Sequence, residues 1–313
     1  MYYPYLRGRQ FELLALRNFT ETLTGHYKIF PIIEPVRENK NSLKKAICTM
    51  TEKGMKYGII LNPEYGDCAG EFLDFSNETD FPEASKWSPS FILNKNNISL
   101  IEESINKNGY KDVILILPKG SSIDEDHLIN LISNKAISKV LTDKDRRRIT
   151  RATRKYNKEL IELDDKFIAQ PTNQSYINID EDLFSEEFAY FKDEGYAGFA
   201  DYTILPNEFR EGGTLPKVVV IQLSYKKTDD QIFVKHFCSN SNQEDRSNIQ
   251  GKFAEAAHKA ILFFSQINYN SPAIDYLKGN IVSGTFPGLG VLKKISILHH
   301  LDLLQRILNT SEQ

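Results

Sequence analysis

The sequence has little cysteine: Cys48, Cys68 and Cys238 are the three in 313 residues. Three is an odd number and no two are spaced as CxxC, so neither a disulfide framework nor a cysteine zinc site is predicted. Runs of 18 consecutive apolar residues are missing too, and we expect no membrane partner. The opening MYYPYLRGRQ lacks the charged-then-apolar order of a secretory signal. We therefore expect a cytoplasmic protein with reduced thiols.

An excess of positive charge is also absent. The chain has 39 Lys and Arg against 42 Asp and Glu, a formal net charge of -3 at pH 7. This balance argues against a surface built as a whole for nucleic acid, for which a basic footprint is expected. Hydrophobic residues make up 41% and charged residues 26%, the composition of an ordinary soluble globular protein. A local basic patch is still compatible with these numbers.

Short apolar, β-branched runs alternate with helical patterns along most of the chain. This alternation is typical of βα units around a parallel sheet. Eight candidate strands can be identified, and seven are followed by or lie close to a helical pattern, which favours a closed (β/α)8 TIM barrel over an open sheet. The eight runs are YPYL, KIFPIIEPV, YGIILNP, DVILILPKG, ISKVLTD, KFIAQP, YAGFADYTILP and KVVVIQLSY.

Three additions to the barrel are predicted. A turn-rich insertion at 65–97 follows the third strand. The run QIFVKHFCS follows the eighth strand after KKTDD, which predicts a projecting hairpin. Two helical patterns, GKFAEAAHKAILFFSQI and VLKKISILHHLDLLQRIL, come last. Because no internal repeat is found, we predict one domain over 1–313, whose residues 225–313 form an elaborated C-terminal part.

The carboxyl ends of parallel barrel strands meet at one mouth, where side chains from distant parts of the chain gather. Arginines there can bind an anion such as phosphate, and carboxylates can serve as acids or bases or hold a divalent metal. We predict ligand binding by Arg7, Arg9, Asn62, Gln170 and Gln222, and catalytic roles for Glu34, Asp143 and Asp201.

Two alternatives are open at the mouth. Arg7 can instead pair with Glu34 across adjacent strands and simply close the rim of the barrel. Asp201 lies in an otherwise apolar strand, and a buried carboxylate must be paired, protonated or bound to a metal. A functional role and a structural one are therefore both open for Asp201.

The segment DRRRITRATRKYNKEL predicts a basic helix. Arg147, Arg151, Arg154 and Lys155 share one helical face, which can follow a phosphate backbone and indicates a weak nucleic-acid site. A solvated face is the alternative, because acidic neighbours dilute the charge and no interleaved aromatic residues offer base stacking.

The runs PYLRGRQFELLAL, PIIEPV, YGIILNP and GYAGFADYTI together resemble the Beta-protein family, a group of largely uncharacterised phage and bacterial proteins of similar length. The resemblance covers roughly the first 65 residues and a block near residue 200. Bacterial members tend to occur in mobile, defence-like gene neighbourhoods, commonly beside a small nuclease-like protein. The motif positions that the resemblance implies are Arg7, Gly8, Arg9, Glu34, Pro35, Asn62, Pro63 and Asp201.

Two hypotheses for function follow. In the first, the protein is a component of a bacterial antiphage defence cassette. It binds an anionic ligand or nucleotide at the barrel mouth and a partner protein, such as a nuclease encoded nearby, through its C-terminal additions. In the alternative, it is a metal-assisted hydrolase of a phosphorylated or nucleotide substrate that uses Glu34, Asp143 and Asp201. Only the hydrolase requires carboxylates that converge within about 5 Å to share a divalent metal.

Overall fold

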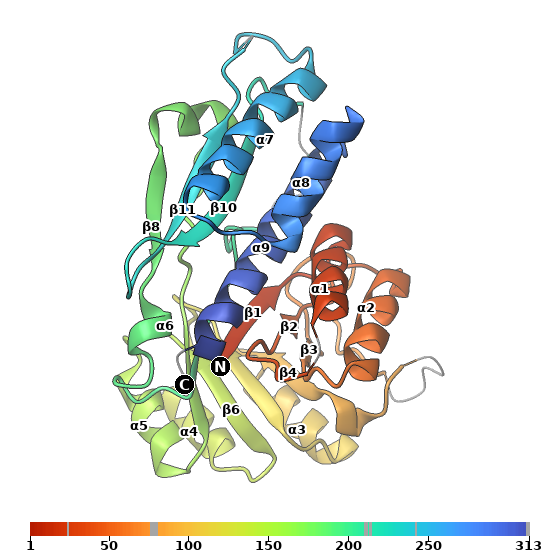
Figure 1. Cartoon of the computed structure of the whole chain (residues 1–313). Coiled ribbons are helices and arrows are strands. Elements are labelled where there is room, and N and C mark those ends of the chain that lie inside the picture. The colour runs from red at the N-terminus through yellow and green to blue at the C-terminus, as the bar shows by residue number, and fades with distance from the viewer. Residues whose placement is uncertain (24, 76–80, 210–211, 213–214, 242, 311–313) are drawn as a thin grey trace.

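The computed structural model describes residues 1–313 except 24, 76–80, 210–211, 213–214, 242 and 311–313 (Figure 1). A closed barrel of eight parallel strands confirms the predicted fold class. In their order around the barrel, the strands are β1 (Tyr2–Leu6), β2 (Ile32–Ile33), β3 (Gly58–Ile60), β4 (Ser88–Ile92), β5 (Val113–Leu117), β6 (Ile137–Thr142), β7 (Glu159–Leu163) and β9 (Gly198–Asp201).

Pairing between β1 and β9 closes the barrel. Tyr3 is in register with Ala200, and Pro4 with Asp201. Because successive side chains of a strand point to opposite faces, Tyr3, Tyr5 and Ala200 face the barrel interior, where they join a buried apolar cluster. The alternate positions of the same two strands, including Asp201, therefore face outward.

Five helices follow barrel strands in the expected βα manner. They are α1 (Gln10–Thr22) after β1, α2 (Asn41–Glu52) after β2, α3 (Ile98–Asn108) after β4, α4 (Glu125–Ile132) after β5 and α5 (Arg147–Lys155) after β6. Between β3 and β4 the described residues contain the 3-10 turn η1 (Ala84–Lys86) instead of an α-helix. No helix in the described ranges is long and apolar enough to cross a membrane.

A second sheet stands beside the barrel. It is antiparallel, in the order β10 (Val220–Lys226), β11 (Ile232–Cys238) and β8 (Glu181–Ser185). Both β8 and the turn η2 (Asn173–Asn178) come from the connection between β7 and β9, which also contains α6 (Glu187–Tyr190). The predicted hairpin is therefore present, as β10 and β11.

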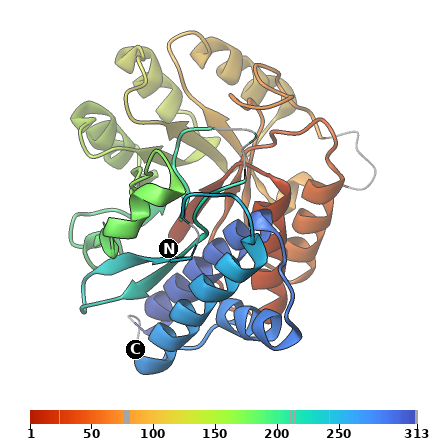
Figure 2. The same ribbon diagram turned by 90° about the horizontal axis from the view of Figure 1, so that it is seen from above.

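Three C-terminal helices follow the second sheet: α7 (Ile249–Gln266), α8 (Pro272–Ser283) and α9 (Leu289–Thr310). Of these, α7 and α9 pack on the sheet, and α8 packs on α7 and α9. Figure 2 shows these helices and the sheet on the same side of the barrel. In Figure 1, α9 runs from the second sheet down to the barrel, and the two termini lie close together. The last helix thus joins both parts of the molecule, because it contacts α1 as well as β10.

Two of the eight predicted barrel strands are wrong. KFIAQP belongs to the connection after β7, and KVVVIQLSY contains β10 of the second sheet. The two barrel strands that replace them are β4, inside the predicted insertion 65–97, and β7, at the end of the predicted basic helix. The segment EDLFSEEFAYFKDEG has a helical pattern, but it contains β8 and only the short α6. Residues 76–80 of the predicted insertion and 311–313 of the C-terminal part lie outside the described residues.

The corner between β1 and α1 depends on Gly8. Its backbone has φ of +55°, a region that L side chains rarely adopt. The end of β2 also approaches closely, since Glu34 N donates to Leu6 O at 2.8 Å. A Cβ on Gly8 would lie 2.8 Å from the Glu34 carbonyl oxygen. Glycine therefore lets the chain turn here and places Arg7 and Arg9 on either side of the corner.

We expect Gly8→Ala to destabilise the protein by more than backbone strain alone. The matched control is Gly109→Ala, because Gly109 has a similar φ of +62° but nothing within 4 Å of its added Cβ. The left-handed conformation costs about 1–2 kcal/mol in both variants, and the overlap at Gly8 adds roughly 1–3 kcal/mol. Urea unfolding measures both losses; equal losses would contradict the close approach at Gly8.

Candidate functional site

A cavity of about 410 Å³ lies between the barrel mouth, the second sheet and the first turns of α9. It brings together four of the five predicted ligand-binding residues: Arg7, Arg9, Gln170 and Gln222. Residues that were not predicted complete the wall, among them Tyr5, Glu12, Phe167, Asn173, Tyr176, Tyr202, Glu208, Leu292 and Lys293. The cavity wall therefore combines aromatic and apolar side chains with a smaller number of charged and amide-bearing ones.

The Arg7 side chain is held on all sides. Its Nε lies 3.8 Å from Glu34 Oε2, and its guanidinium donates to both the backbone and side-chain oxygens of Asn207. The guanidinium carbon lies 4.9 Å from the ring centroid of Tyr65 and 5.4 Å from that of Tyr202. Arg7 is only 7% exposed, and its hydrogen bonds to Pro206 and Asn207 hold the loop after β9 against the mouth.

Glu34 is fully buried and its oxygens are occupied. Oε1 accepts hydrogen bonds from the backbone N–H groups of Glu64, at 2.7 Å, and Tyr65, at 3.2 Å. Oε2 accepts from the Tyr5 hydroxyl at 2.8 Å, beside Arg7. Burial raises the pKa of Glu34 despite these contacts. The Arg7–Glu34 ion pair that the sequence left open is therefore present and closes the rim.

Arg9 and Lys293 form the charged side of the cavity wall. The Arg9 guanidinium lies 4.3 Å from the ring centroid of Phe209, and Lys293 comes from the first turns of α9. Partial burial, and then the positive charge of Arg9, lower the pKa of Lys293, while Glu12 opposes the shift. Glu12 is buried and accepts from the Arg7 backbone N–H at 2.6 Å. Two cations thus repel each other at the edge of the cavity.

Asn62 and Asp143 are engaged with nearby groups. Asn62 Nδ2 donates to Ile92 O at 2.7 Å, and Asn62 Oδ1 accepts from Ile92 N at 2.9 Å, so the amide caps the end of β4. Asp143 accepts from the backbone N–H of Asp145 at 2.9 Å and lies 3.3 Å from Arg146 Nε. Neither residue lines the cavity.

Asp201 points away from the mouth, toward the outer face of β1. Its Oδ1 accepts from the Tyr2 hydroxyl at 2.5 Å and from the Thr203 backbone N–H at 2.7 Å. Burial raises the pKa of Asp201 to about 6, against the effect of these two hydrogen bonds. The paired state of this carboxylate, one of the three allowed by the sequence, is therefore the one present.

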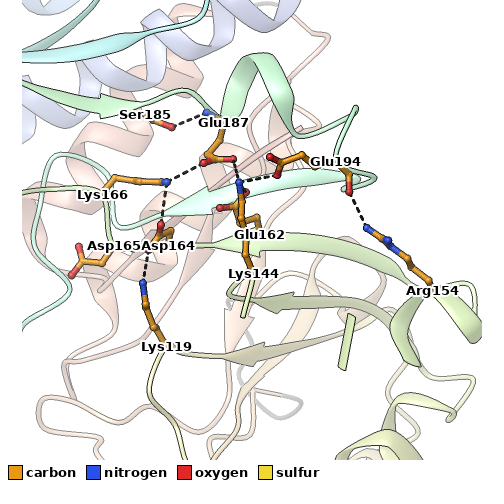
Figure 3. Close-up of polar contacts among 10 residues, drawn as sticks. All are labelled: Lys119, Lys144, Arg154, Glu162, Asp164, Asp165, Lys166, Ser185, Glu187 and Glu194. Atoms are coloured by element: carbon orange, nitrogen blue, oxygen red, sulfur yellow. Dashed lines mark hydrogen bonds and ion pairs between the residues drawn. The ribbon is translucent and has the colours of Figure 1, made fainter. Parts of the chain in front are cut away.

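A second cluster of charged groups lies beside β7 and was not predicted (Figure 3). Lys144 Nζ lies 3.5 Å from Glu162, 3.1 Å from Glu187 and 2.7 Å from Glu194. Within the described part of the chain, these glutamates are the group of three carboxylates whose oxygens lie within 4.8 Å of one another. Glu34, Asp143 and Asp201 do not form such a group.

The Lys144 ammonium occupies the centre of the three carboxylates, where a metal ion would otherwise compensate their charge (Figure 3). The network continues through Lys166, which lies 3.0 Å from both Glu187 and Asp164. Contacts between oppositely charged side chains account for this arrangement, which joins α6 and the following turn to the end of β6.

The two most buried carboxylates of the cluster titrate in opposite directions. Burial raises the pKa of Glu162 to about 8, assisted by its hydrogen bond with Glu187. Burial alone would also raise the pKa of Glu187, but that same hydrogen bond and the positive charges of Lys166 and Lys144 outweigh it and lower the pKa. Of the two carboxylates, Glu162 is therefore the one that holds a proton more tightly.

The sequence contained one signal for this cluster. Glu162 is a charged residue within the apolar run ELIEL, but only the first two residues of this run belong to the predicted basic helix, and no strand is predicted there. As a strand, it would have shown a carboxylate alternating with buried Leu and Ile side chains. Lys144, Glu187 and Glu194 come from loops and a one-turn helix, and no local pattern brings them together.

The predicted basic face on α5 is present. Arg147, Arg151, Arg154 and Lys155 are all exposed. Arg154 donates to the carbonyl oxygens of Glu194, at 2.9 Å, and Gly195, at 3.4 Å.

In comparisons with known proteins, no family model matches the chain and no curated protein matches it. A solved structure described as CdNal from Clostridium difficile in complex with mannosamine is similar over 98% of each chain, with 11% sequence identity and a TM-score of 0.40. A likeness of this size says nothing about the site, and the barrel is established by its own strand pairing. The resemblance to the Beta-protein family stays a prediction.

The raised pKa of Glu162 predicts a stability that falls as the pH rises. Above the ordinary glutamate pKa of 4.5 the unfolded chain releases this proton, whereas the folded protein keeps it until about pH 8. Across this window the folded state binds one more proton, so the free energy of unfolding decreases by up to about 1.4 kcal/mol per pH unit. The variant Glu162→Gln has no such proton to release. Its free energy of unfolding, relative to that of the wild type, should therefore increase from pH 5 to pH 8.

Denaturant unfolding of both proteins at several pH values measures that difference and cancels the titrations that they share. The control is Glu159→Gln, on the same strand but exposed. A difference between wild type and Glu162→Gln that stays constant from pH 5 to pH 9 would show that Glu162 is ionised in the folded protein.

Proposed function

We propose that the cavity at the barrel mouth binds a small anionic molecule that carries a flat apolar part, such as a nucleotide. The observation that carries this proposal is the pair of cations Arg9 and Lys293, both in the cavity wall and close enough for Arg9 to lower the pKa of Lys293. An anion between them would relieve this repulsion and form charge-assisted hydrogen bonds with both side chains.

The other wall of the cavity suits a ring system. Tyr5, Tyr176 and Tyr202 are buried side chains that line it, and Phe167 is partly buried there. Aromatic side chains stack on flat ligands, and a few polar groups then fix the orientation. Gln222, held by a 3.2 Å hydrogen bond between its Nε2 and His236 Nδ1, is such a group.

This proposal divides the roles of the two arginines of the β1–α1 corner. Arg7 is committed to Glu34, Asn207 and the surrounding rings, so it supports the mouth. Arg9 is half-buried in the cavity wall and is the arginine that we assign to the anion.

The alternative predicted from the sequence, a metal-assisted hydrolase, has less support. Its three carboxylates would need to share a metal, but Asp201 is bonded on the outer side of the barrel and Asp143 is paired with Arg146. Glu34 is bonded to Tyr5 and to backbone N–H groups. We therefore prefer binding without hydrolysis.

The antiphage role and the nuclease partner follow from the family resemblance and remain proposals. The C-terminal helices do offer apolar side chains to a partner, because Leu262 on α7 is 61% exposed and Val282 on α8 is 89% exposed. Single exposed apolar residues are common on protein surfaces, so they add little weight.

We expect the wild-type protein to bind AMP, and adenosine more weakly, because adenosine lacks the charged group. The double variant Arg9→Gln, Lys293→Gln should bind AMP at least about tenfold more weakly, since each hydrogen bond to a charged group contributes roughly 1.5–3 kcal/mol. Equilibrium dialysis with AMP, adenosine and inorganic phosphate measures these affinities.

The matched control is Lys294→Gln. It removes the same charge one residue further along α9, where Lys294 Nζ lies 4.4 Å from the Tyr276 ring centroid, outside the cavity. AMP binding that is absent at millimolar concentration, or equal in the double variant and the wild type, would contradict the proposal.

A further inference from the structure

The outer face of α5 carries a row of cations. Arg147, Arg151 and Lys155 are exposed and follow one another at intervals of four residues. An interval of four residues is about 6 Å along a helix, so the three charges span about 12 Å on one side. The opposite side of α5 packs on the barrel through Ile149 and Ala152. Figure 1 shows α5 at the outside of the barrel, beside α4.

These three charges have no acidic partner within ion-pair distance among the residues that the structure describes. Arg148, by contrast, is neutralised by Glu125 at 3.2 Å and Asp126 at 2.5 Å on α4. Arg154 donates hydrogen bonds to carbonyl oxygens, which fix its position but do not neutralise its charge. The face therefore keeps its positive charge in a protein whose overall charge is -3.

We infer that this face of α5 binds the phosphate backbone of a nucleic-acid duplex. Duplex DNA has about one negative charge per 1.7 Å of its axis. This spacing is much shorter than the distance of about 6 Å between neighbouring cations, so each cation lies near a phosphate wherever the helix sits along the duplex. A single strand is less suitable, because single-strand binding sites stack bases on aromatic side chains and the exposed face of α5 has none. The aromatic residue beside this face, Tyr156, follows the helix and is partly buried against the core. An acidic protein surface would have to match the three positions individually.

The contact is with the backbone alone, so binding does not depend on base sequence. Phosphate contacts position a protein on a duplex, whereas base contacts give specificity. The site is separate from the mouth cavity, whose wall includes no residue of α5.

Fluorescence anisotropy with a labelled 30-base-pair DNA duplex tests the inference. Each neutralised phosphate contributes about -0.9 to the slope of log K against log salt, so three contacts predict a slope near -2.7. The affinity should then fall about 40-fold between 50 and 200 mM salt. In the variant Arg147→Gln, Arg151→Gln, Lys155→Gln, the slope should approach zero and binding at 50 mM salt should weaken at least tenfold.

The matched control is Lys45→Gln, Lys53→Gln, Lys107→Gln, which removes three exposed charges from α2, the end of α2 and α3. This control should keep the wild-type slope. Equal losses in both triple variants would overturn the inference, because net charge would then explain the binding. An absence of duplex binding at 50 mM salt, or tighter binding of polyglutamate than of the duplex, would also overturn it.

Discussion

Closure of the barrel between β1 and β9 is the constraint on which the rest of the structure depends. The two strands are almost 200 residues apart, yet Tyr2 must pair with Phe199. Once β9 has closed the barrel, the chain leaves over the mouth, where the oxygens of Pro206 and Asn207 meet Arg7. No position in the barrel is then left for the next apolar runs, so β10 pairs with β11, and β11 pairs with β8. The cavity lies between the barrel mouth, the loop after β9 and the second sheet.

The fold class was predictable because alternating apolar strands and helices leave few arrangements other than a parallel barrel. Which apolar runs form the strands of the barrel was less predictable. The strand β4 begins Ser88-Pro89-Ser90, which reads as a turn, although all its residues are buried. The run KVVVIQLSY resembles a buried barrel strand because α9 covers β10 in the second sheet. Whether a run is buried by a barrel or by a helix is decided by tertiary contacts that local sequence does not encode.

The candidate site shows the same limit. Strand ends identified Arg7 and Arg9, because all parallel strands end at one mouth. Gln222 also lines the cavity, but it comes from β10 of the second sheet and not from a barrel strand as predicted. Strand ends could not identify Lys293, which arrives from the last helix. Nor could they separate Glu34, at the rim, from Asp201, on the outer face, since one residue of shift along a strand reverses the direction of the side chain. A sequence pattern locates the end of a strand. It does not show which of the alternating side chains point into the barrel, and this direction decides whether a residue reaches the mouth.

The helix α9 covers a surface that is formed by a much earlier part of the chain. Gln305 accepts a hydrogen bond from the Lys28 backbone N–H and donates one to His26 O, and the His300 ring packs edge-on to Tyr2 of the first strand. The outer side of β1 is therefore synthesised long before α9, the helix that covers it. During synthesis from the N-terminus, this apolar surface stays accessible to chaperones, or to other nascent chains, until α9 has been synthesised.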